Sequence, residues 1–241
     1  MIVEIREVEK VKLKNAIMIE GFPGIGMIGT ISASYLADKL GLRVIGYISS
    51  SHFPPIAPIH DYVPLSPARI YASEKHNLII LFSEFVIPSE VAFALSQKIL
   101  KYAREKGVKE IYSLAGIASE TPQDKIYGIG STKEMVEKLK KAGIEVIKEG
   151  ATQGVSGLLI AECAAEKFPA ANILIQTSQP MEPKGSAKLL AKLSEIIKVP
   201  VDVKPLIAEG AVIEEKIKAS MDKIKDMHAK YNEMGENPAY A

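Results

Sequence analysis

Short apolar runs alternate with amphipathic helical segments along most of this chain, and this alternation constrains the fold more than any other feature. Apolar residues at helical spacing predict helices that each cover one face of a sheet. Runs that are apolar throughout are typical of strands buried between two helical layers. We therefore expect an α/β protein, a three-layer α/β/α sandwich with a mostly parallel central sheet.

The boundaries of the expected elements follow from the glycines and prolines between these runs. The segments 15–20, 27–40 and 42–48 predict a right-handed βαβ unit whose two strands pair in parallel. The segment 49–67 holds five prolines and is expected to be an ordered loop or a sheet edge. Further strands are expected at 1–6, 68–73, 77–82, 108–114, 125–129, 144–147 and 171–176, and further helices at 88–106, 131–142, 158–167 and 184–197.

Three regions are expected along the 241 residues. Residues 1–205 predict one α/β core domain, because neither a repeat nor a low-complexity linker divides them. Residues 206–232 predict a C-terminal helical arm, in which apolar residues such as Ile217, Met221 and Ile224 recur at steps of three and four. Gly235 and Pro238 are expected to end the helix, which leaves residues 233–241 as a flexible tail.

Composition excludes several classes of function. The formal net charge of +1 provides no general attraction for nucleic acid or for an anionic membrane surface. No apolar run reaches the roughly 20 residues that a membrane span needs. A single cysteine cannot form an internal disulfide, which fits a reducing compartment. We expect a cytoplasmic protein whose partners are neither nucleic acid nor membrane.

A glycine-rich turn follows the strand predicted at 15–20. Gly21 precedes the pattern Gly24-x-Gly26-x-x-Gly29, which by itself matches a dinucleotide-binding fingerprint. That fingerprint needs an acidic residue about 20 positions later, whereas the second strand ends in serines and the first acid after it is Asp61. The lysine of a phosphate-binding P-loop is also missing. A structural turn is the favoured interpretation, and the alternative is a nucleoside- or nucleotide-binding enzyme that uses the Gly24–Gly29 loop.

Metal and thiol chemistry find little support in the sequence. His52, His60 and Asp61 share the proline-rich loop, but their spacing matches none of the usual zinc patterns. Cys163 lies in an apolar helical segment without a flanking cation or histidine, which indicates a buried structural thiol. We expect no metal and no cofactor.

No set of residues predicts a catalytic centre. The sequence lacks a G-x-S-x-G nucleophile elbow. Glu84 and Glu90 flank the start of a predicted helix, where carboxylates complement the helix dipole, and we interpret both in that way. We therefore assign no catalytic residue and expect a protein that is not an enzyme.

Three motifs of the body resemble the proteasome assembly chaperone family. The run from Glu20 to Gly29 is similar to the family's N-terminal signature, and it extends a bare glycine pattern with fixed neighbours. The stretches 114–117 and 154–159 are also similar, and the resemblance covers the chain from the first strand to about Ile197. It implies an α/β fold related to phosphorylase-like hydrolases, without established catalysis.

The last three residues, Ala239-Tyr240-Ala241, are similar to the hydrophobic–tyrosine–any motif of proteasome activators and several assembly chaperones. That resemblance implies docking on the proteasome α-ring, with the α-carboxylate paired to a lysine between adjacent α-subunits and the Tyr240 ring on apolar surface. One such anchor binds weakly, so several arms on a homo-oligomer, a tetramer or pentamer, are expected. The expected function is that of a proteasome assembly chaperone or activator-like factor.

Overall fold

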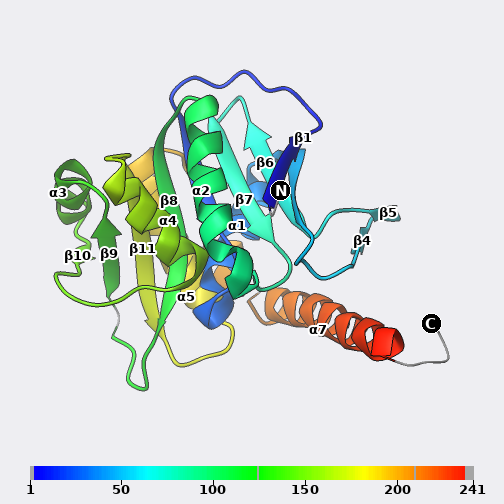
Figure 1. Ribbon diagram of the computed structural model, residues 1–241. Helices are drawn as coiled ribbons and strands as arrows, with labels where there is room; N and C mark the ends of the chain where they lie inside the picture. The colour runs from blue at the N-terminus through cyan, green and yellow to red at the C-terminus, as the bar shows by residue number, and fades with distance from the viewer. Residues whose placement is uncertain (1–2, 124, 209, 237–241) are drawn as a thin grey trace.

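The computed structural model describes residues 3–123, 125–208 and 210–236 of the chain. Within these ranges a nine-stranded sheet with the order β1-β3-β6-β7-β2-β8-β11-β9-β10 forms the centre of the molecule (Figure 1). The nine strands are β1 (Val3–Glu7), β2 (Ala16–Gly21), β3 (Arg43–Ser50), β6 (Ala68–Ser73), β7 (Leu78–Ser83), β8 (Val108–Ala118), β9 (Ile126–Gly130), β10 (Glu145–Val146) and β11 (Ala170–Thr177).

The middle of this sheet is parallel and its flanks are mixed. Strands β7, β2, β8 and β11 form a parallel block. The pairs β1–β3, β3–β6, β6–β7 and β9–β11 are antiparallel. The expected mostly parallel sheet is thus confirmed for its centre, where strands buried on both faces are rich in apolar residues.

Helices cover both faces of the sheet, as the apolar runs predict. Helices α1 (Ile28–Lys39) and α5 (Pro183–Ile197) pack on one face, and α2 (Ser89–Glu105) and α4 (Gly154–Ala165) pack on the other (Figure 1). Helix α3 (Lys133–Lys141) lies beside β9 and β10 at one edge. The three-layer α/β/α architecture is confirmed.

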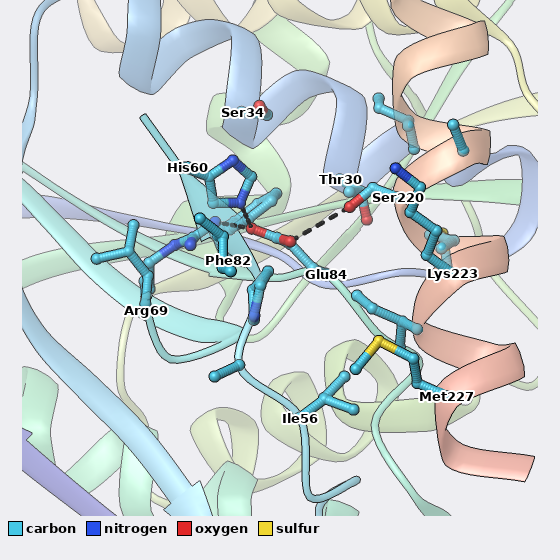
Figure 2. Close-up of a pocket in the computed structure, with 18 of the residues that line it drawn as sticks. Thr30, Ser34, Ile56, His60, Arg69, Phe82, Glu84, Ser220, Lys223 and Met227 are labelled. Atoms are coloured by element: carbon cyan, nitrogen blue, oxygen red, sulfur yellow. Dashed lines mark hydrogen bonds and ion pairs between the residues drawn. The ribbon is translucent and has the colours of Figure 1, made fainter. Parts of the chain in front are cut away.

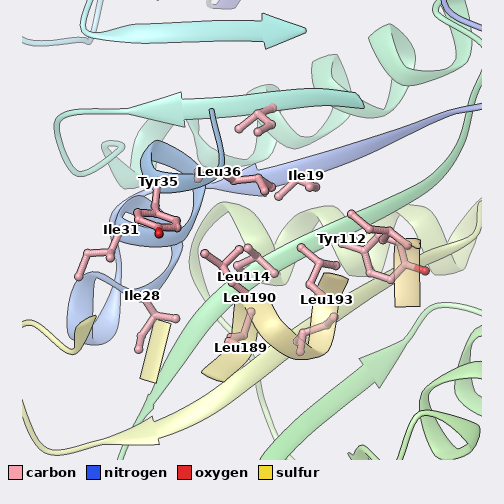
Figure 3. Close-up of a cluster of buried hydrophobic side chains, with 14 of the residues drawn as sticks. Ile19, Ile28, Ile31, Tyr35, Leu36, Tyr112, Leu114, Leu189, Leu190 and Leu193 are labelled. Carbon is pink, nitrogen blue, oxygen red and sulfur yellow. The ribbon is translucent and has the colours of Figure 1, made fainter. Parts of the chain in front are cut away.

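The core between the sheet and the α1/α5 layer is built mainly from aliphatic side chains, and its buried aromatic residues are Tyr35, Phe82 and Tyr112. In α5, spacing of three and four residues places the apolar side chains on the side that faces the sheet, whereas α1 is buried over most of its surface. Figure 3 shows this cluster, which includes Ile19, Ile28, Ile31, Tyr35, Leu36, Tyr112, Leu114, Leu189, Leu190 and Leu193.

The expected parallel pairing of the strands around α1 is wrong. Strand β3 pairs with β1 and β6, and the hairpin β6–β7 lies between β3 and β2. The proline-rich segment after β3 leads the chain back so that this hairpin can insert. That segment is an ordered loop that carries the short ribbon of β4 (Ile59–His60) and β5 (Val63–Pro64).

The C-terminal arm begins with α6 (Lys204–Ala208) and continues as α7 (Gly210–Glu236). A helix of 27 residues is about 40 Å long, and its far half extends away from the body (Figure 1). The helix runs through Gly235, so residues 233–236 are helical where we expected a tail. No helix of the described residues is both long and apolar enough to cross a bilayer.

Candidate functional site

The glycine turn after β2 packs against the chain's own backbone. A Cβ on Gly21 would lie 2.4 Å from the carbonyl oxygen of Gly29. A Cβ on Gly29 would lie 2.4 Å from the carbonyl oxygen of Leu114 in β8 and 2.8 Å from that of Phe22. Real Cβ atoms do not approach oxygens so closely, so glycine is needed here for the contact of α1 with the sheet. This packing supports the structural interpretation of the turn.

The remaining two glycines of the motif differ from each other. Gly26 has a φ of +66°, and its carbonyl accepts a hydrogen bond of 2.9 Å from the amide of Glu182 at the start of α5. A Cβ on Gly24 would have no heavy atom within 4 Å. Helix η1 (Ile25–Met27) forms the turn itself. These contacts join the turn to the protein and give no support to the alternative of a nucleotide at this loop.

A buried carboxyl group lies at the end of β2, beside the turn. Glu20 is fully buried; it accepts hydrogen bonds from the Phe22 amide at 2.9 Å and from the Ser156 hydroxyl at 2.7 Å. Burial raises the pKa of Glu20, and the hydrogen bonds from Phe22, Ser113 and Ser156 oppose this rise. The Asn172 amide donates to the Ser156 carbonyl at 3.2 Å. The cluster therefore connects β2, β8, β11 and α4 through the centre of the molecule.

A pocket with a volume of about 830 Å³ lies at the carboxyl end of β7. Its walls come from α1, the loop 56–65, β6, β7 and α7 (Figure 2). Ligand sites of α/β proteins commonly lie at this end of the parallel strands. The position and size fit a small-molecule site, whose usual range is about 300–1,000 Å³.

A buried ion pair forms the polar part of this pocket. Arg69 on β6 pairs with Glu84, and their side chains are 4% and 7% exposed. His60 contacts the same carboxylate at 2.8 Å, and the Ser220 hydroxyl of α7 donates to it at 3.4 Å (Figure 2). The arm and the proline-rich loop are thereby joined to one carboxylate. Paired charges of this kind avoid the cost of a buried lone ion.

The interpretation of Glu84 as a helix-dipole partner is wrong, because its carboxylate is buried against Arg69. Glu90 does lie in the first turn of α2, as expected. The sequence holds a signal for the missed pair. In the hairpin predicted from 68–73 and 77–82, Arg69 falls opposite Phe82, two residues before Glu84. Two opposite charges at adjoining ends of apolar strands indicate a buried pair.

The metal-ligand candidates His52 and His60 contact different side chains. His52 contacts Ser51 in the exposed loop, whereas His60 contacts Glu84. Among the described residues no three His, Cys, Asp or Glu side chains are grouped as a metal site. Cys163 is buried, which confirms the structural interpretation, and burial raises the pKa of its thiol to about 12.

The proximal part of α7 is seated on the body and the distal part is exposed. Ile224 is buried, and Ile217 and Met221 are half-buried against the core. Met227 and Tyr231 are 55% and 60% exposed. The expected apolar stripe is therefore covered over only part of its length. The predicted docking residues Ala239, Tyr240 and Ala241 lie outside the described residues.

Comparison with protein families gives one match that spans most of the fold. The model of the PAC2 family matches residues 18–221, which include the glycine turn, the Glu20 cluster and most of the pocket. The chain belongs to the PAC2 family. An uncharacterized protein of Methanocaldococcus jannaschii is 32% identical to this PAC2 chain over 236 residues, which cover 97% of the chain and 96% of that protein.

Two solved structures from Pyrococcus furiosus extend the comparison. PbaA, described as an archaeal homolog of proteasome-assembly chaperone, has a TM-score of 0.82 and 28% identity, over 93% of this chain and 99% of its own. PbaB, described as an archaeal proteasome activator, has a TM-score of 0.76 and 22% identity, over 90% of this chain and 98% of its own. The likeness to PbaB shows that this chain and PbaB have the same fold.

Proposed function

We propose that this PAC2 protein is a non-enzymatic homo-oligomer that binds the proteasome α-ring through its C-terminal residues and acts as an assembly chaperone or activator-like factor. One observation carries the proposal. The chain is similar over nearly its whole length to Pyrococcus furiosus PbaA, a homolog of proteasome-assembly chaperone, at 28% identity and a TM-score of 0.82. A likeness over 93% of this chain extends beyond the α/β body into the arm.

The geometry of α7 supports a role as an arm. Ile224 and the Ser220 hydrogen bond to Glu84 hold its proximal part on the body. Its distal part extends past the body, with Met227 and Tyr231 exposed (Figure 1). A helix fixed at one end holds its other end at a defined position relative to the body. This reduces the freedom that is lost when the terminal residues bind.

The chemistry of the terminal tripeptide suits a narrow pocket between subunits. In the proposed complex the α-carboxylate of Ala241 pairs with a lysine of the α-ring, and the Tyr240 ring covers apolar surface while its hydroxyl reaches a backbone group. Ala239 takes the small apolar position. Pro238 restricts the chain ahead of the anchor, which lowers the entropy cost of docking.

Several arms are needed because three residues alone bind weakly. In a tetramer or pentamer each arm after the first binds at a raised effective concentration if the arm spacing matches the pockets of the ring. The proposed homo-oligomer thus converts a weak anchor into stable binding. Its contacts would bury exposed apolar side chains such as Met227 and Tyr231.

Capture of proteasome α-subunits on immobilised protein tests the proposal. Removal of residues 240–241 or the substitution Tyr240→Ala is expected to reduce capture at least about tenfold, since each removes part of the anchor on every arm. Residues appended after Ala241 should have the same effect, because they remove the α-carboxylate from its position. Tyr62→Ala is the matched control, since Tyr62 is fully exposed beside the β4–β5 ribbon and should leave capture unchanged.

Equal capture by the intact and the shortened protein would contradict docking through the terminus. Sedimentation velocity of both forms shows whether the loss acts through assembly. If the terminus binds only the α-ring, the shortened protein should keep the assembly size of the intact one. A smaller particle would instead indicate that the terminus joins copies of this chain.

A further inference from the structure

The pocket at the carboxyl end of β7 contains buried donors that the protein itself does not satisfy. Two nitrogens of Arg69, Nε and Nη1, are buried without a hydrogen-bond partner, and so is the hydroxyl of Thr30 on α1. All three groups belong to residues that line the pocket (Figure 2). Buried polar groups without partners are rare and cost about 1–3 kcal/mol each. They indicate that a ligand binds at this place.

The chemistry of the missing partner can be read from the groups that are already paired. One oxygen of Glu84 contacts Arg69 and His60, and the other accepts from Ser220. The carboxylate therefore has little capacity left, whereas the Arg69 nitrogens can only donate. A ligand that fits must bring a hydrogen-bond acceptor.

The net charge and the apolar surface of the pocket narrow the class of ligand further. Among the described Lys, Arg, Asp and Glu side chains that line the pocket, Arg69 and Lys223 are cationic and Glu84 is anionic, which leaves an excess of one positive charge. A single negative charge balances this excess, whereas a phosphate dianion would leave net repulsion beside Glu84. Much of the remaining wall is apolar: Ile56, Leu65, Tyr71, Phe82, Met221 and Met227.

We propose that this pocket binds a small organic carboxylate with an apolar body, such as a medium-chain fatty acid or an arylalkanoic acid. The carboxylate accepts from Arg69 and Thr30 and lies within the field of Lys223. The hydrocarbon or ring packs on the apolar wall. A buried carboxylate held by a guanidinium gains charge-assisted hydrogen bonds, which are stronger than neutral ones.

Binding at this site is linked to the position of the arm. Helix α7 supplies Ser220, Lys223 and Met227 to one wall, and the opposite walls belong to the α/β body. A ligand that contacts both surfaces stabilises the seated arm, because it binds that arrangement and loses contacts when the arm departs. Occupancy should therefore slow hydrogen exchange of the α7 amides.

Calorimetric titration with octanoate and 3-phenylpropionate, each compared with its amide, tests the proposal. Saturable binding of one acid per chain is expected, with the amide at least about tenfold weaker because it lacks the charge. Saturating acid should raise Tm by about 5 °C. Lys223→Gln is expected to weaken binding of the acid about threefold to tenfold. Lys225→Gln, two positions further along the same helix and exposed, should not change it.

A pocket-filling variant keeps the test independent of the buried ion pair. Ser34 is exposed on α1 and lines the pocket, so Ser34→Trp should abolish binding without disturbing the core. Asp38→Trp, on the same helix but away from the pocket, should bind as the unmodified protein does. The absence of binding by both acids, or binding that survives Ser34→Trp, would overturn the site. Equal affinity for acid and amide would overturn its charge selectivity.

Discussion

Gly29 shows how the lack of a side chain determines where a helix lies on a sheet. Its Cα faces the Leu114 carbonyl of β8, and even a methyl group would meet that oxygen at 2.4 Å. Helix α1 can approach β2 and β8 this closely only because the position is glycine. The motif that resembles a nucleotide loop in sequence is here a contact between a helix and its own sheet.

The substitution Gly29→Ala should therefore lower the free energy of unfolding by about 2 kcal/mol or more, since overpacking against backbone cannot relax by a rotamer change. Gly24→Ala is the matched control from the same motif. No heavy atom lies within 4 Å of its Cβ position, and its φ of −161° is extended backbone. Urea denaturation of both variants measures the difference, and equal costs would contradict the packing argument.

Glu20 is a second residue whose burial has a measurable consequence. Burial raises its pKa in the folded protein above the ordinary value of 4.5, so the folded state binds the proton more tightly than the unfolded chain does. The contribution of Glu20 to stability then falls as pH rises from about 4.5 through the folded pKa. In the folded protein, ionisation of the buried Glu20 carboxyl group costs free energy.

Glu20→Gln removes this titration. The free energy of unfolding of the variant, measured relative to that of the unmodified protein, should increase with pH across that window. The slope should reach at most about 1.4 kcal/mol per pH unit. Urea denaturation of both proteins at a series of pH values from about 4.5 to 8 gives the comparison. A difference that stays constant with pH would show that Glu20 titrates alike in both states.

Helix α7 combines two segments with different environments. From Ile217 to Ile224 it packs on the body and contributes to the pocket. Beyond that segment Met227 and Tyr231 are largely exposed. The apolar stripe continues through both segments. Periodicity alone therefore predicts the helix, but it does not predict where the body stops covering the stripe.

Ile224→Ala should release the seated segment, because it removes a buried side chain at the junction with the body. Large-to-small changes at such sites cost about 2–5 kcal/mol, and an edge position belongs at the lower end. Lys230→Ala, at an exposed polar position of the same helix, is the control. Hydrogen exchange should quicken over α7 in the first variant only. Equal exchange in both would place the anchoring of α7 elsewhere.

The whole molecule is organised by the order of strands in its sheet. Insertion of the β6–β7 hairpin between β3 and β2 brings Arg69 and Glu84 to the carboxyl end of the parallel block. The same edge receives the proline-rich loop and α7. Pocket, arm and family motifs thus meet at one end of the fold, which is the usual place for ligand sites in α/β proteins.

Much of the element assignment could be predicted because it is local. The apolar run of β2, the glycine turn and the hairpin pairing 68–73 with 77–82 depend on neighbouring residues and turn chemistry. The position of β3 could not be predicted in this way. Its pairing with β6 depends on the distant packing of the sheet, and the short βαβ spacing favours the wrong neighbour.

The sequence by itself determined the α/β class, the helical arm and the need for glycine at the turn, because hydrophobic period and backbone sterics act within a few residues. Tertiary structure alone decided that the Arg69–Glu84 pair lies under the Ser220 hydroxyl of α7 and that buried donors remain unpaired there. The contact of α7 with this pair depends on how elements far apart in the chain pack together. That packing minimises the free energy of the whole fold and cannot be read from neighbouring residues.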